Sequence, residues 1–349
     1  MKLRIRNPQS TIGNPEGIAL LMVLWVMAIL SVLALEFSFA MRTEVNIAKN
    51  YKEELQLYAL AKGGVQRAVA ELVFKHDPRV QQMRKTLKSE EIPPDKKEWV
   101  TDGRSYLLSS DQAVCELRIM SEAGKIDINT VSENTLRKVV GNLGLQGEAR
   151  DIVVDSVMDW RDPDDFSRVN GAENDYYQTL KEPYNCKNGN LDSIEELLLV
   201  RGVTPELFYG RKGTKNEEAG KGYPAGLKDL FSVYAQGEQI DINSASPIAL
   251  RFVLGIPEEV SRRIVSAREE KGFESILDLR QRVPEFGLLP NVGEIESLLG
   301  TLSTTSYYTI ESKAKNKEGG SNRGLKVIVK IDPREKKNYK IIQWLDKLY

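Results

Sequence analysis

Residues 18–35 read IALLMVLWVMAILSVLAL, a run without charge in which Ser31 is the one polar side chain. As a helix rising about 1.5 Å per residue, this run extends ~27 Å, close to the ~30 Å hydrocarbon core of a bilayer. The preceding segment, residues 1–17, is polar and basic. Because positively charged flanks stay in the cytoplasm, the sequence predicts a single-pass membrane helix with the rest of the chain on the far side.

The helical pattern continues beyond this run without a break. Residues 36–74 contain no proline, and Gly63-Gly64 is their only glycine pair. A secretory signal cleaved after Ala40 would not need this continuation. We therefore expect residues 18–74 to form one retained helix, first in lipid and then against a head domain. Its amphipathic face follows steps of three or four residues and their multiples, at Val45, Ala48, Tyr51, Leu55, Tyr58, Val65, Val69 and Leu72.

The ionisable residues limit the possible function classes. The 349-residue chain carries 49 Lys and Arg against 50 Asp and Glu, so its overall charge gives no reason to expect nucleic acid. The only histidine, His76, lies at the end of the expected helix, and one histidine with two cysteines cannot complete a Cys/His zinc site. No catalytic pair is apparent, and we expect no enzyme. In an oxidising compartment, a disulfide between Cys115 and Cys186 is possible.

Strand patterns occur on both sides of a long helical block, residues 131–300. Because short hairpins of low hydrophobicity are marginal alone, we expect them to form one small antiparallel sheet against the long helix. This predicts an α+β fold: a discontinuous domain of residues 75–130 and 301–349, interrupted by an inserted all-α domain. The charged stretch 75–98 reads as a linker. The expected strands are Trp99–Ser109, Ala113–Asn129, Tyr307–Lys315, Arg323–Ile331 and Tyr339–Trp344.

The tetrapeptide Ile-Asp-Ile-Asn occurs twice, at residues 126–129 and 240–243. Each copy precedes an expected helix, beginning near Ser132 in the first case and at Ser246-Pro247 in the second. Serine at the N-cap, followed by proline at the first helical position, is a strong helix start signal. We interpret each copy as an extended piece that leads the chain into a helix.

Residues 240–282 resemble a helix-hairpin-helix motif, which opens DNA binding as an alternative function. In DNA-binding members, a second glycine follows the first by two residues so that backbone N–H groups reach phosphate. Here Pro257 follows Gly255 at that spacing, and proline has no N–H. Residues 240–286 also carry eight Asp and Glu against seven Lys and Arg, so they offer no basic surface for phosphate. We favour a packing scaffold with a core of Leu250, Val253, Leu254, Val260, Ile264 and Leu279.

The densest cluster of acids lies in DWRDPDDFSRVNGAENDYY, residues 159–177. Ca²⁺ takes six to eight oxygens from flexible, carboxylate-rich loops, and Gly171 allows the loop to turn back on itself. The spacing of an EF-hand is absent. The alternatives are a solvated loop capped by Arg161 and Arg168, or a glycosidase pair, which would need aromatic sugar platforms that this loop does not offer. The cluster comprises Asp159, Asp162, Asp164, Asp165, Glu173 and Asp175.

The N-terminal pattern, a glycine between a basic leader and an apolar run, resembles the type IV prepilins. In that class, a prepilin peptidase cuts after the glycine and methylates the new N-terminus. The resemblance implies a cut between Gly17 and Ile18, with residues 1–17 as the leader. Most members carry Glu at the fifth position after the cut, where this chain has Met22. Because a carboxylate in lipid needs a paired charge, Met22 suits a subunit that does not repeat along a filament.

The acidic stretch with Trp160 and Tyr177 resembles the Asp-Trp-x-Asp-x-Asp and Glu-Asp-x-Tyr signatures of the K-type minor pseudopilins of type II secretion systems, the general secretion pathway protein K family. Asn174 departs from that pattern, since Asp is common there. A long helix with a small sheet interrupted by a large α-domain is also similar to this family, so the resemblance covers nearly the whole chain. It continues through Pro183-Tyr184, Asn188, Glu195-Glu196-Leu197 and Val200-x-Gly202-Val203.

The resemblance implies a subunit at the tip of a periplasmic pseudopilus, where it starts assembly for protein export across the outer membrane. Implied partners are the I- and J-type minor pseudopilins, the inner-membrane platform of the secretion system and the prepilin peptidase. The implied location is the inner membrane, with a cytoplasmic N-terminus and a periplasmic head. Calcium is implied near the acidic stretch, with expected ligands Asp159, Asp162, Asp164, Glu173 and Asp175.

Overall fold

The computed structural model describes residues 15–77, 79–80, 82, 99–210, 225–301 and 305–347, and the chain divides into two compact units, Met1–Ala59 and Leu60–Tyr349. Helix α1 runs from Pro15 to His76, which confirms the long helix expected over residues 18–74. In the first unit, the apolar run is exposed, and an 18-residue window reaches a mean hydropathy of 2.9. Most of the expected leader and linker lies outside the described residues.

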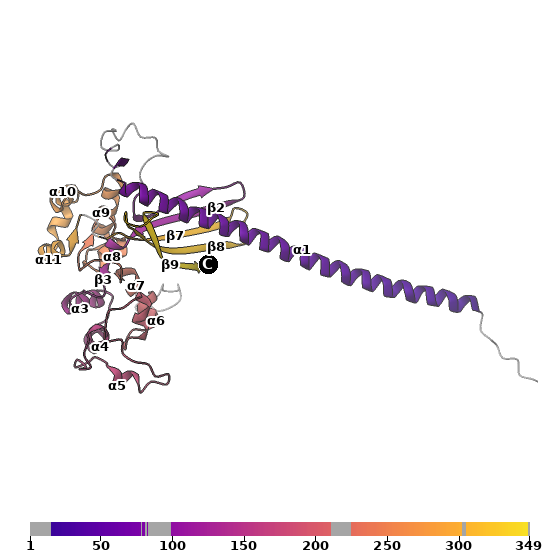
Figure 1. The fold of residues 1–349 in the computed structure, drawn as a ribbon, viewed down its shortest axis with the longest axis horizontal. Helices are drawn as coiled ribbons and strands as arrows, with labels where there is room; N and C mark the ends of the chain where they lie inside the picture. The colour runs from indigo at the N-terminus through magenta and orange to yellow at the C-terminus, as the bar shows by residue number, and fades with distance from the viewer. Residues whose placement is uncertain are drawn as a thin grey trace, which may run out of the picture. The chain divides into compact units, whose positions relative to one another are not determined.

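Among the described residues, five antiparallel strands form one sheet in the order β1-β2-β7-β8-β9 (Figure 1). A turn with positive φ at Gly319 and Gly320 joins β7 to β8, as expected. The strand expected over Ala113–Asn129 was too long, because the side chain of Ser121 caps a 3-10 turn, η3 (Glu122–Gly124), that ends it. The strands are β1 (Asp102–Ser109), β2 (Ala113–Ser121), β7 (Tyr307–Asn316), β8 (Asn322–Ile331) and β9 (Tyr339–Lys347).

Within the second unit, the last turns of α1 pack closely on the sheet. A Cβ at Gly64 would lie 2.8 Å from the Ser312 Oγ and 3.0 Å from the Cys115 Sγ. The same Ser312 hydroxyl donates to the carbonyl of Ala61 at 2.8 Å. Glycine at position 64 therefore allows the helix backbone to approach β2 and β7. The helix side chains buried here are Ala61, Val65, Ala68, Val69 and Leu72.

The helical block is an insertion between two paired strands. Ser121, the last residue of β2, lies opposite Tyr308 of β7 in the register of the sheet. The chain thus leaves the sheet after β2 and returns to the neighbouring strand, which confirms the expected α+β fold with a large insertion. The insertion is mainly helical but not all-α as expected, because two short two-stranded parallel sheets also lie in it. The insertion contains β3 (Ile126–Asp127), α3 (Glu133–Asn142), α4 (Gly147–Arg161), α5 (Asn174–Tyr177), η4 (Ile194–Leu199), α6 (Pro205–Tyr209), α7 (Leu227–Leu230), β4 (Phe231–Ser232), β5 (Ile240–Asp241), α8 (Pro247–Phe252), α9 (Glu258–Glu270), α10 (Ile276–Arg282), η5 (Pro284–Leu288), α11 (Val292–Ser297) and β6 (Leu299–Gly300).

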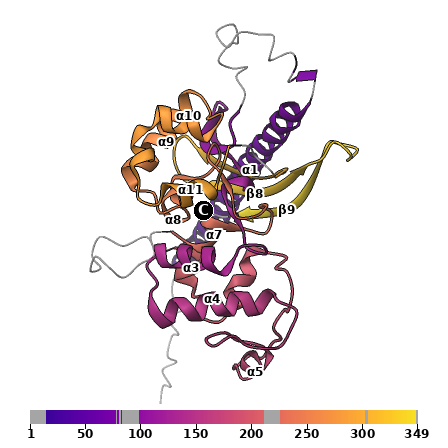
Figure 2. The same cartoon turned by 90° about the vertical axis from the view of Figure 1, so that its left-hand side faces the viewer.

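The repeated tetrapeptide marks two similar helix pairs, α3 with α4 and α8 with α9, which Figure 2 shows as separate groups. The Oγ of Ser132 accepts from the Thr135 N–H at 3.3 Å, and that of Ser246 accepts from the Ala249 N–H at 3.0 Å. These contacts confirm the expected helix starts. The expected core of the second pair is also confirmed, since Leu250, Val253, Leu254, Val260, Ile264 and Leu279 are all buried.

Candidate functional site in the acidic loop

The acidic loop begins at the end of α4 and returns through α5, on a support of aromatic rings. Trp160 and Tyr177 are buried, and their ring centroids lie 5.2 Å apart in an edge-to-face arrangement. Tyr184 stacks on Tyr177 at 5.2 Å, and its hydroxyl donates to the Leu199 carbonyl at 2.6 Å. The aromatic residues that mark the resemblance therefore form the base on which the loop rests.

Arg168 bridges the first two acids of the loop. Its Nη1 donates to the Asp159 Oδ1 at 2.8 Å and to the Asp162 Oδ2 at 2.6 Å. Its backbone N–H also donates to the Asp159 Oδ2 at 3.1 Å. Asp159 is fully buried, and burial raises its pKa even though Arg168 opposes the rise. The guanidinium thus provides the positive charge between two carboxylates.

Arg161 does not cap the loop, contrary to the solvated-loop alternative. Its guanidinium donates to the carbonyls of Ile128, at 2.7 Å, and of Val131. The loop is not simply solvated either, because Asp159 and Glu173 are buried. Arg161 is a packing residue of the first helix pair, and Arg168 is the cation of the loop.

Buried oxygens without partners gather in this loop. Glu173 is 2% exposed, and within the described part of the chain neither of its carboxylate oxygens has a hydrogen-bond partner. The same holds for the Asp162 Oδ1 and the Asn188 Oδ1. Burial raises the pKa of Glu173 to about 7; the Cys186 thiol opposes the rise, and the nearby carboxylates of Asp159 and Asp162 add to it. Unpaired buried acceptors are costly, and a hard cation would satisfy them.

The expected ligands divide into two groups. Asp159 and Asp162 share Arg168, and Glu173 is close enough for their charges to raise its pKa. Asp164 and Asp175, by contrast, are exposed, and each accepts from a neighbouring backbone N–H, that of Phe166 and that of Tyr176. The latter two are poor candidates in this conformation.

Asn188 was missed as a candidate oxygen donor. Its Nδ2 donates to the Asp165 Oδ1 at 2.8 Å, leaving its Oδ1 unpaired among the described residues. In the sequence it marks only the family resemblance, and 23 residues separate it from Asp165, so its spacing gave no sign of a place in the loop.

Gly171 brings the loop back against α4, as expected. A Cβ there would lie 1.8 Å from the Asp159 Oδ2, so no side chain fits. Among the described residues, no group of three or more His, Cys, Asp or Glu side chains is arranged as a ready metal site. The donor types fit Ca²⁺, with oxygens from Asp159, Asp162, Glu173 and Asn188, but Arg168 would have to give up its bridge.

The two thiols are apart. Cys115 lies in β2 under α1, where its Sγ is 3.1 Å from the Ser312 Oγ, and Cys186 lies beneath the acidic loop. Both are free and buried, so the disulfide considered from the sequence is not formed. His76 has contacts at both ring nitrogens, to the Leu72 carbonyl at 2.8 Å and to the Tyr308 hydroxyl at 3.1 Å. The contact with Tyr308 ties the end of α1 to the sheet.

The hairpin of the second helix pair has the expected departure from DNA-binding motifs. Gly255 has a positive φ of 70°, as a tight hairpin requires. Pro257 occupies the N-cap of α9, and it has no N–H to offer to a phosphate.

Comparisons with known proteins identify two family matches and several similar relatives. The family "Type II secretion system (T2SS), protein K" matches residues 114–210, and a helix-hairpin-helix motif family matches residues 235–288. The chain is similar to type II secretion system protein K of Pseudomonas aeruginosa, with 23% identity over 82% of this chain and 81% of that protein. The protein of the same name from Klebsiella pneumoniae is 24% identical over 75% and 77%, respectively.

A shorter and closer match occurs with type II secretion system protein K of Pectobacterium carotovorum, 35% identical over 21% of this chain and 22% of that protein. The fold is similar to a chain in the crystal structure of the GspK-GspI-GspJ complex from enterotoxigenic Escherichia coli. That match has a TM-score of 0.55 at 15% identity and covers 86% of this chain and 99% of the other.

Proposed function

Since the chain belongs to the family of type II secretion system protein K, we propose that this minor pseudopilin occupies the tip of its pseudopilus and starts its assembly. The observation that carries the proposal is the insertion between the paired strands β2 and β7. Subunits of a filament make the same head-to-tail contact repeatedly. An insertion larger than the sheet that carries it obstructs such a repeat, but at an end nothing packs above it.

Met22 supports the same position. A carboxylate at the fifth place after the cut would pair with the free amine of a neighbouring subunit, and Met22 cannot form that pair. A filament can therefore accommodate this subunit only at a position where that charge pairing is not required. The function is structural, without catalysis.

Helix α1 supports a location in the inner membrane. Its apolar run is long enough to cross a bilayer, and the basic leader favours a cytoplasmic N-terminus in the inner membrane. The head then lies in the periplasm. The prepilin peptidase removes the leader between Gly17 and Ile18, which mass spectrometry of the mature N-terminus tests; a terminus at Met41 contradicts it.

The partners follow from the solved complex of similar fold, whose title names GspK with GspI and GspJ. By analogy, the I- and J-type minor pseudopilins contact the amphipathic face of residues 42–74, and the inner-membrane platform receives the assembly. Calcium completes the acidic loop through Asp159, Asp162, Glu173 and Asn188. The unpaired oxygens of that loop support this assignment.

The decisive experiment moves the subunit away from the tip. Residues 122–306 are replaced by Asn-Gly, which joins strands that already pair, and Met22→Glu is added. Immunogold labelling should place full-length protein at filament ends and the double variant along the shaft. The shortened chain without Met22→Glu is the matched control, and it should stay out of the shaft. Full-length protein distributed along filaments contradicts the tip position.

A further inference from the structure

Arg168 is an incomplete cation for the acids around it. Its Nη1 lies 2.8 Å from the Asp159 Oδ1 and 2.6 Å from the Asp162 Oδ2, so one nitrogen bridges two carboxylates. Burial lowers the pKa of the guanidinium, but the hydrogen bonds to Asp162 and Asp159 raise it above its ordinary value, so the group stays charged. The bridge leaves the Asp162 Oδ1 and both oxygens of Glu173 without a hydrogen-bond partner among the described residues.

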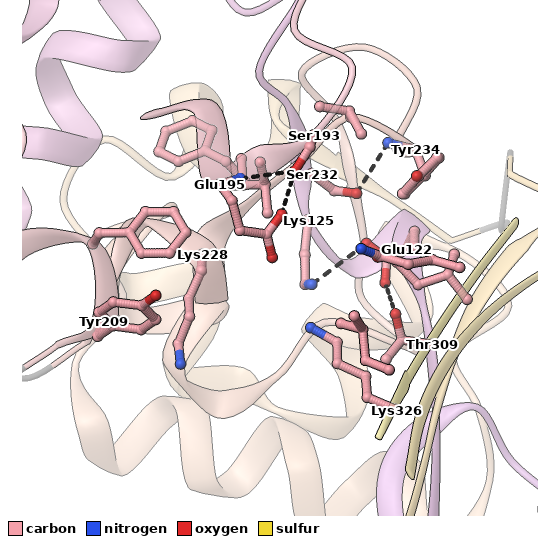
Figure 3. A pocket seen from close by; sticks show the side chains of 17 residues that line it. Glu122, Lys125, Ser193, Glu195, Tyr209, Lys228, Ser232, Tyr234, Thr309 and Lys326 are labelled. Carbon is pink, nitrogen blue, oxygen red and sulfur yellow. Dashed lines mark hydrogen bonds and ion pairs between the residues drawn. The ribbon is translucent and has the colours of Figure 1, made fainter. Parts of the chain in front are cut away.

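A second buried carboxylate of the head shows complete pairing for comparison. Glu122 lines a cavity of about 190 Å³ between the sheet and the insertion (Figure 3). Like Glu173, it is 2% exposed, but it accepts from the Thr309 Oγ1 at 2.5 Å and lies 3.4 Å from the Lys125 Nζ. Glu122 therefore has a cation of its own, and Glu173 has none within the part of the chain that the structure describes.

The guanidinium of Arg168 can leave its place at little cost in packing. The Arg168 side chain is 34% exposed, whereas that of Asp159 is fully buried. Residues 163–167 and Val169, on either side of the arginine, are exposed, so they have little apolar contact to lose when the arginine moves. The buried aromatic rings on which the loop rests need not move with it.

An ion in the loop would need the oxygens that Arg168 now holds. Ca²⁺ takes six to eight oxygens at about 2.3–2.6 Å. The two oxygens of the bridge and the four unpaired oxygens of Glu173, Asp162 and Asn188 reach the lower end of that number. With the bridge in place, however, the described acids are not arranged as a ready metal site. The loop therefore needs a second state, in which the guanidinium has moved away.

We propose that Arg168 takes the place of the calcium ion in the metal-free protein, so that the guanidinium and the ion exclude each other and Arg168 sets the calcium concentration at which the loop changes state. This inference rests on the calcium assignment proposed above and adds its regulation. Apparent affinity falls with the fraction of molecules that are competent to bind, so a bridge formed in about nine-tenths of them lowers the affinity about tenfold.

The first test measures Ca²⁺ binding to the full-length protein in detergent micelles by isothermal titration calorimetry. Arg168→Gln should raise the affinity about tenfold, because no bridge has to be broken. In chelator, the same variant should lower the melting temperature by about 3 °C or more, because two carboxylates lose their cation. These opposite signs identify a competing cation, since a residue that only holds the loop in shape would lower both quantities when replaced.

Lys181→Gln is the matched control for charge. Lys181 is exposed and lies four residues after Tyr177, so its replacement removes an equal charge from the same region without touching the bridge. It should change the calcium affinity less than about twofold, because exposed charges are screened by salt. An equal gain in both variants would mean that the net charge of the region decides the affinity, and it would overturn the proposal.

A second measurement needs no variant. Phenylglyoxal modifies accessible arginines, and mass spectrometry reports the extent of modification at each of them. In the wild type, Arg168 should react severalfold faster at saturating Ca²⁺ than in chelator, because the ion releases the guanidinium into water. Arg161, which donates to the carbonyls of Ile128 and Val131, should react at the same rate in both conditions.

The two ways of failing are distinguishable. Equal calcium affinity of wild type and Arg168→Gln, weaker binding by the variant, or a reactivity of Arg168 that calcium does not change would each overturn the competition and leave the calcium assignment standing. If Ca²⁺ binds neither protein, the calcium assignment itself is wrong, and this inference falls with it.

Discussion

Asn243 and Phe273 exchange two hydrogen bonds: the Asn243 Nδ2 donates to the Phe273 carbonyl at 2.9 Å, and the Phe273 N–H donates to the Asn243 Oδ1 at 2.7 Å. Asn129 and Leu191 make the same pair of contacts, at 3.1 and 2.8 Å. The last residue of each Ile-Asp-Ile-Asn copy therefore ties the start of a helix pair to an extended segment that follows it. The insertion is thus built from two related units.

Asn243→Ala should destabilise the protein by about 2 kcal/mol, because it leaves the polar backbone groups of Phe273 unpaired in a partly buried position. Gln239→Ala is the matched control, since its side chain makes one exposed contact, to the Ser297 carbonyl; we expect less than about 0.5 kcal/mol there. Urea unfolding followed by tryptophan fluorescence measures both. Equal losses would show that the asparagine pair is not the stabilising contact.

The sequence predicted the helix starts of both units but not this role of asparagine. Ser132 and Ser246-Pro247 are local signals, read within one turn of helix. The partner of Asn243 lies 30 residues away and that of Asn129 lies 62 away, and one sequence contains no sign of such pairing.

Two other differences have similar causes. The capped turn that ends the second strand at Ser121 also brings the backbone close to the second helix pair: a Cβ at Gly124 would lie 2.7 Å from the Ser244 carbonyl oxygen. Arg161 is next to the acids in sequence, but as the last residue of α4 it reaches carbonyls about 30 residues earlier. Because Asp159 and Asp162 lie close together in the sequence, their place in one acidic cluster could be predicted from it. The contacts of Arg161 depend on tertiary packing, which the sequence does not show.

Calcium should stabilise the head. With Ca²⁺ at a hundredfold excess over its dissociation constant, the free energy of unfolding should rise by about 2.7 kcal/mol, and chelation should remove this gain. Glu173→Gln should abolish the effect, whereas Asp175→Asn, whose carboxylate is exposed, should keep it. Differential scanning fluorimetry with Ca²⁺, Mg²⁺ or chelator measures this, and Ca²⁺ should act more strongly than Mg²⁺. A calcium gain that survives Glu173→Gln would exclude the buried carboxylate as a ligand.

Glu173 should also give the metal-free protein a pH dependence. Its pKa is raised from 4.5 to about 7 in the folded state, so the native protein holds a proton that the unfolded chain has already released. From about pH 4.5 to about pH 7, ionisation therefore favours unfolding, and this contribution to stability falls as pH rises. Above about pH 7 it no longer changes.

The test compares the melting temperatures of wild type and Glu173→Gln in chelator between pH 5 and pH 7.5. The difference between the two profiles reports the titration of Glu173 alone. Glu173→Gln should lose less stability across that range than wild type. Identical pH profiles would mean that Glu173 is ionised throughout. The affinity for calcium should have the opposite pH dependence. It should increase toward pH 7, because the Glu173 carboxylate must be ionised to bind the ion.

The adjacent glycines of α1 should respond in opposite directions to alanine. Gly63 is exposed with open space around it, so Gly63→Ala should stabilise the helix by up to about 1 kcal/mol. Gly64→Ala gains the same propensity but forces its Cβ against the Ser312 and Cys115 side chains, which are buried. We expect a net loss of about 1–2 kcal/mol. Thermal unfolding of the two variants decides, and a stabilised Gly64→Ala would contradict the close packing of α1 on the sheet.

Of the three arginines of α9, Arg268 and Arg263 should differ strongly in how much their replacement destabilises the protein. Arg268 is 5% exposed, and its Nη1 donates to the carbonyls of Ile242, at 2.8 Å, and Ala245, at 2.6 Å. Its Nε lies 3.8 Å from an oxygen of Asp102 in β1, so it also connects the insertion to the sheet. Arg268→Met keeps much of the side-chain volume but leaves two carbonyls without their donor, and we expect a loss of about 3 kcal/mol.

Arg263→Met is the control on the same helix, because that side chain is 63% exposed and paired with Glu285; surface ion pairs of this kind contribute about 0–1 kcal/mol. Hydrogen exchange adds a readout that distinguishes a local from a global effect. In Arg268→Met, amides around Ile242 and in β1 near Asp102 should lose protection together, since one side chain holds both segments. Loss confined to α9, or a stability change no larger than that of Arg263→Met, would mean that the junction between sheet and insertion is held by apolar packing alone.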